Sequence, residues 1–150
     1  KKLRLEDALN ATRAAIEEGI IIGGGACLAN VSNEVREQLR SDVVDVQKGI
    51  NIVLDSLTAP LYQIAENAGY DGDEIVKKQL AEKDNVGFDA KNGKWVDMFE
   101  EGIVDPCKVT RSALLNAASV SGLLITTEAA VGTIKEKEPA MPAGGGMGMY

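Results

Sequence analysis

The side chains that most often carry catalysis or bind metals are sparse in this sequence. Its 150 residues include no histidine, and its two cysteines, Cys27 and Cys107, lie far apart. Zinc in proteins usually takes about four ligands, mostly histidine and cysteine, so a zinc site is not predicted. The spacing leaves a disulfide open, although free thiols in an intracellular protein are the favoured interpretation. Acidic residues and glycines remain as candidates for chemistry.

Three consecutive glycines, Gly23-Gly24-Gly25, follow an isoleucine run at residues 20–22. Such clusters can hold phosphates, because backbone N–H groups approach a ligand closely where no side chain intervenes. A P-loop requires the spacing GxxxxGK[ST], and no lysine stands near these glycines. Taken alone, the residues favour a tight turn between two packed elements.

Three aspartates stand where a carboxylate could act on a ligand, and each also has an ordinary structural interpretation. Asp7 lies off the apolar face of a predicted helix, where carboxylates are usually solvated. Asp89, with Ala90 and Lys91, falls on the first strand of a predicted hairpin. Asp105 opens the run DPCKV and is suited to cap a helix, which would contribute about 1 kcal/mol. The residues alone leave both interpretations open.

Composition limits what these residues can serve. With 45% hydrophobic and 26% charged residues, the chain is sized and composed for one globular domain. A formal net charge of −7 argues against a nucleic-acid surface. No stretch has the length of a membrane span, and the opening KKLRLEDAL is typical of a helix interior rather than of a signal peptide. We therefore expect the chain to begin inside a longer protein.

Helices dominate the predicted structure, because apolar residues recur at helical spacing in most of the chain. Asp42 is expected to cap the third helix, and Pro60 to open the fourth. Asp71 and Glu74 have the spacing of a capping box at the start of the fifth. The predicted helices cover residues 5–16, 26–39, 43–57, 60–68, 71–80 and 105–124.

Extended segments are fewer. Residues 20–22 are predicted as a short strand or an extended linker. Asn92-Gly93 is the pair that favours a type I′ turn, so a β-hairpin is expected around it. Residues 125–134 are interpreted as a last strand, and the Gly/Met-rich residues 135–150 as a tail that cannot bury enough surface to fold.

Several stretches together resemble the group I chaperonins of bacteria, mitochondria and chloroplasts. The run EDALNATRAAIEEGIIIGGGACL is similar to the segment that joins the family's intermediate domain to the second half of its equatorial domain. The run GFDAKNGKWVDMFEEGIVDPCKVTRSALLNAASVSGLLITTEAAV is similar to the rest of that half. The ending GGGMGMY is similar to the Gly-Gly-Met tails that hang into the chaperonin cavity.

The resemblance covers essentially the whole chain and implies a mainly α fold with one small β-hairpin and a C-terminal strand. It implies that residues 1–18 end the intermediate domain and that residues 19–134 form the C-terminal half of the equatorial ATPase domain. Residues 135–150 would be the flexible tail.

The resemblance also assigns roles in an ATP site. Asp7, within EDAL, would position the water that attacks the γ-phosphate. Bacterial members usually carry Asn-Ala-Ala where this chain has Asp-Ala-Lys. Gly24 would lie against the sugar of the nucleotide, and Asp105 would contact the ribose hydroxyls. Ile103 would pack on the face of the adenine. The edge of the adenine would be recognised by Asp89, Ala90 and Lys91.

ATP and Mg²⁺ are the implied cofactors, with the phosphate loop and the main magnesium ligand in an N-terminal half that these residues do not include. No metal site is expected in this chain. Heptameric rings are the implied assembly. Unfolded clients and a co-chaperonin lid would bind through an apical domain, and neither nucleic acid nor a membrane is an expected partner.

Two functions of different kinds remain open. In the first, the chain is part of an ATP-driven chaperonin that encloses and folds polypeptides. In the second, the isolated fragment is a catalytically inert helical assembly module, because it lacks the phosphate loop. Asp89 and the single tyrosine at the end of the tail favour the mitochondrial matrix or a related organelle, with the bacterial cytoplasm as the other option.

Overall fold

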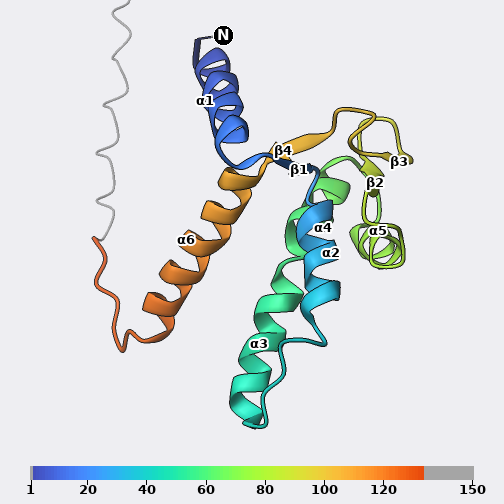
Figure 1. Ribbon diagram of the computed structural model, residues 1–150. Coiled ribbons are helices and arrows are strands. Elements are labelled where there is room, and N and C mark those ends of the chain that lie inside the picture. Colours follow the sequence, from blue (N-terminus) through green and yellow to red (C-terminus); the bar gives the residue numbers. More distant parts are fainter. Residues whose placement is uncertain (1, 134–150) are drawn as a thin grey trace, which may run out of the picture.

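The computed structural model describes residues 2–133, and the tail predicted for residues 135–150 lies outside that range. Helices predominate within it, which confirms the expected mainly α fold (Figure 1). The elements in chain order are α1 (Lys2–Glu18), β1 (Ile20–Ile22), α2 (Ala26–Val35), α3 (Val44–Ser56), α4 (Ala59–Asn67), α5 (Gly72–Gln79), β2 (Val86–Asp89), β3 (Lys94–Asp97), β4 (Val104–Pro106) and α6 (Cys107–Ile125).

The strands form two separate antiparallel pairs. β2 and β3 are the predicted hairpin, with Phe88 opposite Trp95. β1 pairs instead with β4, which places Ile21 opposite Asp105. β4 was not predicted, because the run DPCKV is typical of the start of a helix. This second pair joins two segments that lie far apart in the sequence.

Two small clusters form the core. The larger one lies between α2, α4, α5 and β2, and its buried members are Ala29, Leu61, Ala65, Ile75 and Phe88. The smaller one joins β1, the start of α2 and the segment after β3 through Ile22, Ala26 and Met98. Both clusters flank the glycine turn between β1 and α2. The turn is therefore held from both sides.

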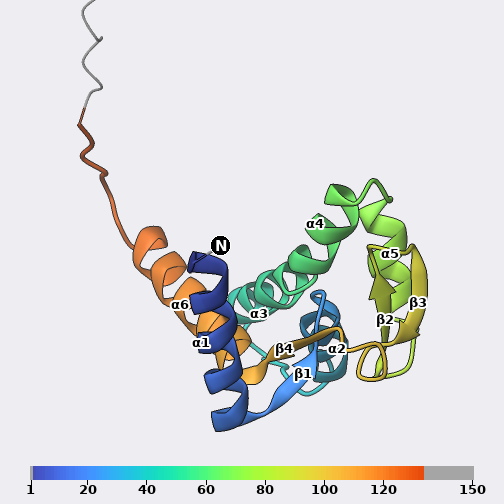
Figure 2. The same ribbon diagram turned by 90° about the horizontal axis from the view of Figure 1, so that it is seen from above.

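Helices α1 and α6 stand apart from the rest of the chain. They contact each other, and the β1–β4 pair lies between them and the other elements, as the two views in Figures 1 and 2 show. Neither helix has a buried residue. Burial therefore contributes little to holding either helix in place.

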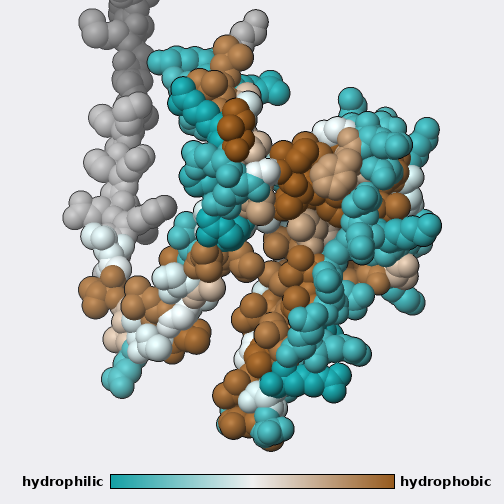
Figure 3. Space-filling view, viewed as in Figure 1, coloured by the Kyte–Doolittle hydropathy of each residue, from teal (hydrophilic) through white to brown (hydrophobic). Residues whose placement is uncertain are grey.

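The apolar stripes predicted for three helices are largely exposed. Figure 3 shows apolar surface along α1, α3 and the far end of α6. Only Leu54 is buried within α3. The predicted helices are correct, but the described residues supply no partner for these faces. Large exposed members include Leu5, Leu9, Ile16, Val46, Val53, Val120 and Leu124.

The helix caps and helix ends predicted from local sequence agree with the structure in some places and not in others. The Asp71 side chain accepts a hydrogen bond from Glu74 N at 3.0 Å, which confirms that Asp71 caps α5. The predicted cap at Asp42 is wrong, because α3 follows Val43, and the Ser41 hydroxyl accepts from Val43 N instead. Helix α2 ends at Val35, short of the predicted residue 39, and gives way to a turn.

Two further expectations differ from the structure. The hairpin loop has four residues, 90–93, and only Gly93 has a positive φ, so the predicted two-residue type I′ turn at Asn92-Gly93 is not formed. The expected strand over residues 125–134 is absent from its described part. Helix α6 continues to Ile125, and no strand follows up to residue 133.

Candidate functional site

The glycine turn lets three parts of the chain approach closely. Gly23 N donates to Ile103 O at 2.9 Å, which ties the turn to the segment before β4. A Cβ on Gly25 would lie 2.5 Å from Leu61 N, so α2 can pack against α4 only with glycine there. Gly24 has φ +63° and space beside Met98. The expected tight turn is therefore present, and Gly24 is the one of the three glycines at which a Cβ would meet only ordinary van der Waals contacts.

The hairpin loop is organised by one carboxylate. Asp89 is 8% exposed, and its Oδ1 accepts from Lys91 N at 2.9 Å and from Asn92 N at 3.2 Å. Its Oδ2 accepts from Asn92 Nδ2 at 2.6 Å. The hydrogen bonds from Asn92, chiefly that from its side chain, lower the pKa of Asp89. These bonds also account for the longer loop, because they hold the backbone of residues 91 and 92 around the carboxylate.

A cavity of about 490 Å³ lies between the glycine turn, the hairpin loop and the segment before β4. Five of the seven sequence-predicted site residues line it: Gly24, Asp89, Ala90, Lys91 and Ile103. The lining also includes four residues that were not predicted as site residues: Ile64, Phe88, Asn92 and Glu101. The position of Asn92 directly after the predicted adenine edge was the one signal available for it.

Asp105 lines a neighbouring, larger and mostly apolar cavity of about 870 Å³. The two cavities share Ile64 as a wall, and the consecutive residues Gly24 and Gly25 line one each. Burial raises the pKa of Asp105. The prediction that Asp105 caps the last helix is wrong: it lies in β4, and α6 follows Pro106 with no side-chain cap. Its carboxylate is thus not used in capping.

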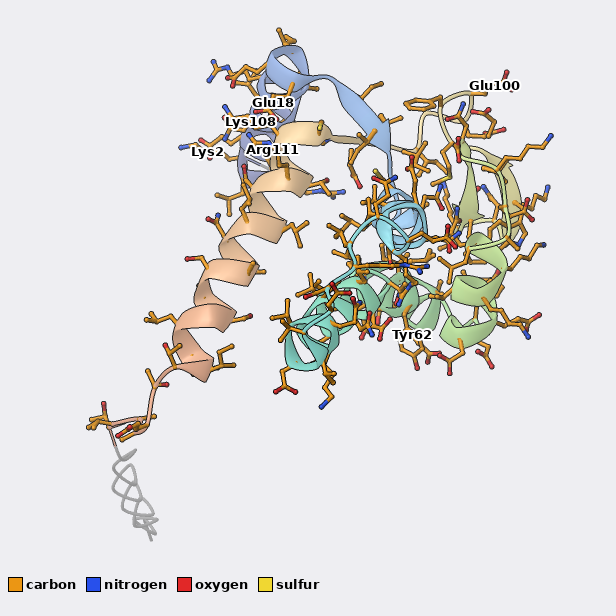
Figure 4. All side chains as sticks on the ribbon, turned by 60° about the horizontal axis from the view of Figure 1, so that its bottom comes forward. Lys2, Glu18, Tyr62, Glu100, Lys108 and Arg111 are labelled. Atoms are coloured by element: carbon orange, nitrogen blue, oxygen red, sulfur yellow. The ribbon has the colours of Figure 1, made fainter. Side chains whose placement is uncertain are left out.

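Asp7 lies apart from both cavities. It is exposed on α1, about 18 Å along the helix axis from Gly19. The base of α1 is held by two ion pairs to α6, Glu17 with Lys108 and Glu18 with Arg111. Figure 4 shows Glu18, Lys108 and Arg111 gathered where α1 meets α6. Asp7 is therefore linked to the cavities through the length of α1 and its junction with β1, and not by direct contact.

The two cysteines are free and half-buried. Burial, with a smaller effect of the neighbouring Cys107 and Asp105, raises the pKa of the Cys27 thiol. The favoured prediction of unpaired thiols is confirmed. Among residues 2–133, no group of three acidic, histidine or cysteine side chains converges to hold a metal ion. These residues alone do not fit a Mg²⁺ site.

No helix in the described part of the chain is both long and apolar enough to span a membrane.

The residues around the smaller cavity do fit a nucleoside. Ile103 offers apolar contact for a flat base, the hairpin loop offers polar atoms, and Gly24 has no side chain to block close approach. A triphosphate would need cationic or backbone donors, and among the described residues Lys91 is the only cation lining this cavity.

Comparison with known proteins adds independent findings. Residues 1–135 match the model of the TCP-1/cpn60 chaperonin family. A protein named chaperonin GroEL from Acholeplasma laidlawii is 58% identical over 142 residues, which are 95% of this chain and 26% of that protein. Another of that name, from Onion yellows phytoplasma, is 58% identical over 138 residues, 92% of this chain and 26% of its own. The chain thus spans about a quarter of these relatives.

A solved structure has a similar fold. The open-state monomer of a group II chaperonin from Methanococcoides burtonii superposes with a TM-score of 0.70 and 24% identity. The match covers 82% of this chain and 32% of that chain. The relatives at 58% identity come from bacteria, so they lend no support to the mitochondrial preference drawn from Asp89 and the tail.

Proposed function

The chain belongs to the TCP-1/cpn60 chaperonin family, and we propose that it supplies the adenine and ribose side of the ATP site in a longer, ATP-dependent chaperonin. That protein would use ATP hydrolysis to enclose and fold unfolded polypeptides. Residues 1–18 would end its intermediate domain, and residues 19–134 would form the C-terminal half of its equatorial domain.

The cavity beside the glycine turn is the observation that carries this proposal. It gathers Gly24, Ala90, Lys91 and Ile103 from three segments that are distant in the sequence, around a space of about 490 Å³. Ile103 would pack on the face of the adenine, and Gly24 would lie against the sugar. Asp105, at the adjoining cavity, would accept from the ribose hydroxyls, since one carboxylate has several acceptor sites.

Asp7 would position the water that attacks the γ-phosphate. Phosphoryl transfer leaves little covalent chemistry to the protein, so placing the water and stabilising charge are the main tasks. Because Asp7 is remote from both cavities, α1 must swing about its junction with β1 to bring the carboxylate to the phosphates. Gly19 follows the last turn of α1 at φ +82°, with open space at its Cβ position, which supports a pivot there.

The rest of the longer protein would complete the site and the assembly. It would supply the phosphate loop, the Mg²⁺ ligands, and the surfaces for client proteins and a co-chaperonin lid. The exposed apolar faces of α1, α3 and α6 support packing against such further segments, and seven-membered rings are the proposed assembly. The isolated chain would be inactive. With bacterial relatives, we assign the protein to the bacterial cytoplasm.

Photoaffinity labelling of the full-length protein with 8-azido-ATP tests the site. We expect label on the peptide that spans residues 86–105, and loss of that label with excess ATP. Ala90→Trp should fill the cavity and abolish labelling, whereas Ala81→Trp, at an exposed position beyond α5, should not. Label confined to other parts of the protein, unchanged by Ala90→Trp, would contradict the proposed site.

A further inference from the structure

The orientation of the Asn92 amide is fixed by its partner. An ionised carboxylate can only accept hydrogen bonds, so the atom of Asn92 that lies 2.6 Å from Asp89 Oδ2 must be the amide nitrogen. The oxygen and nitrogen of an asparagine are otherwise hard to tell apart. Here the charge of Asp89 decides, and Oδ1 of Asn92 is the end that points away from Asp89.

Asp89 itself is poorly placed to contact a ligand. It is buried, and its oxygens already accept from Lys91 N, Asn92 N and Asn92 Nδ2. These bonds use the backbone N–H groups of Lys91 and Asn92, and Gly93 N donates to Asp89 O. Two polar side chains of this loop that line the cavity are exposed, Lys91 and Asn92. The Lys91 ammonium can only donate, so Oδ1 of Asn92 is the side-chain acceptor that these two can offer to a ligand.

We propose that Asn92 selects adenine over guanine at this cavity, with Oδ1 accepting from the exocyclic amino group of the base and Asp89 acting as the residue that positions it. The inference rests on the proposed function, since it concerns the base of the same nucleotide. Adenine carries a donor at the position where guanine carries a carbonyl oxygen. An acceptor fixed at the loop therefore forms a hydrogen bond with adenine and repels the carbonyl oxygen of guanine.

The substitution Asp89→Asn gives a sharp test, because it keeps the shape and reverses the amide. The oxygen of the new amide would accept from the two backbone N–H groups, and its nitrogen would face Asn92. Asn92 would then have to accept, so its own nitrogen would turn toward the ligand. The double substitution D89N/N92D restores an outward acceptor, because the carboxylate at position 92 accepts from position 89 and presents its second oxygen.

The measurement is the equilibrium dissociation constant of the full-length protein for ATP and for GTP, by calorimetry. We expect the preference for ATP over GTP to fall by about tenfold in Asp89→Asn and in Asn92→Ala, as for the loss of one hydrogen bond. It should return in D89N/N92D. Asn67→Ala is the matched control: it removes an exposed asparagine that also makes one side-chain hydrogen bond, on α4 outside the cavity lining.

A purely structural role for the pair predicts a different pattern. Both nucleotides would then weaken equally in Asp89→Asn and Asn92→Ala, and that result would overturn the inference, as would a double variant with no recovered preference. Failure of the proposed function is separately visible. In that case the unsubstituted protein would show no ATP-competed label on residues 86–105, whatever its affinity for either nucleotide.

Discussion

Arg111 binds Glu18 through two nitrogens, with Nε 3.0 Å from one carboxylate oxygen and Nη2 2.6 Å from the other. This paired geometry fixes direction as well as distance, which a lysine cannot do. It joins the first turns of α6 to the last turn of α1. Since neither helix has a buried residue, these polar contacts largely determine the angle between the two helices.

Arg111→Ala should therefore loosen α1 at neutral pH. Spin labels at Asn10 on α1 and Ser119 on α6 of the full-length protein, both exposed positions, would report this as a broader distance distribution. Arg111→Lys, which keeps the charge but loses the fork, should give an intermediate width. Lys48→Ala, which removes the exposed pair with Asp45 on α3, is the control and should change nothing.

Acid should have the same effect on the unsubstituted protein. The hydrogen bond from Arg111 lowers the pKa of Glu18 from its ordinary value of 4.5. A lowered pKa means that the pair stabilises the structure fully above the ordinary value and that this contribution is lost as the pH falls through the lowered one. The distance distribution should stay narrow at neutral pH and broaden only well into the acid range. Broadening that begins above about pH 5 would contradict this cause.

The glycine turn predicts unequal effects of alanine at neighbouring positions. Gly25→Ala would bring a Cβ to 2.5 Å from Leu61 N and would keep a residue at φ +79°, so we expect a loss of at least about 3 kcal/mol. Gly24→Ala has room, with the nearest atom 3.4 Å away, and should lose only the about 1–2 kcal/mol that φ +63° costs. Scanning calorimetry of the full-length variants should rank them in this order, and equal losses would argue against packing as the reason.

The role proposed for Asp7 predicts a separation of binding from hydrolysis. In the full-length protein, Asp7→Ala should leave ATP affinity nearly unchanged and slow single-turnover hydrolysis by about 100-fold or more, because a water-positioning group acts mainly in the transition state. Glu6→Ala, which alters the adjacent and also exposed carboxylate, should hydrolyse ATP at close to the normal rate. Normal single-turnover hydrolysis by Asp7→Ala would remove Asp7 from the mechanism.

The 150-residue chain alone should neither turn over ATP nor bind it tightly. Its described residues gather the proposed adenine contacts around one cavity but include no metal-binding cluster. We expect affinity in the millimolar range, from the nucleoside contacts only, and adenosine should bind about as well as ATP. Calorimetry that gives a micromolar dissociation constant for ATP would show that phosphate contacts exist within these residues.

What could be predicted from the sequence was mostly local. The helix cap at Asp71 and the hairpin strands depend on neighbours within a few residues, and both are present. The hairpin turn was mispredicted because a side chain, Asp89, competes for the loop N–H groups that the Asn-Gly rule leaves to the backbone. Strand β4 was missed because its partner β1 lies far away in the sequence, and Asp-Pro is a strong local signal for a helix start.

The site shows the same division. The resemblance named five residues that the fold brings to one cavity, although nothing in their spacing would have joined Gly24 to Ile103. Asn92, which also lines this cavity, was not predicted, because its side chain is held there by a hydrogen bond to Asp89 that the sequence does not reveal. Burial was the least predictable property. The apolar stripes of α1, α3 and α6 are correct as helical patterns, yet their partners are not among the described residues.

The β1–β4 pair is the point about which α1 can rotate relative to the rest of the chain. The pairing of residues 20–22 with 104–106 connects two distant segments of the chain. Helix α1, with 17 residues and a length of about 26 Å, extends from this strand pair like a lever. A rotation of about 10° at this strand pair would move the far end of α1 by about 4.5 Å, several times the displacement of any atom within the strand pair. Cys107 N donates to Gly19 O at 3.1 Å at the base of this lever. A slight rearrangement of the backbone there would therefore move the far end of α1 by a distance comparable to the length of a side chain.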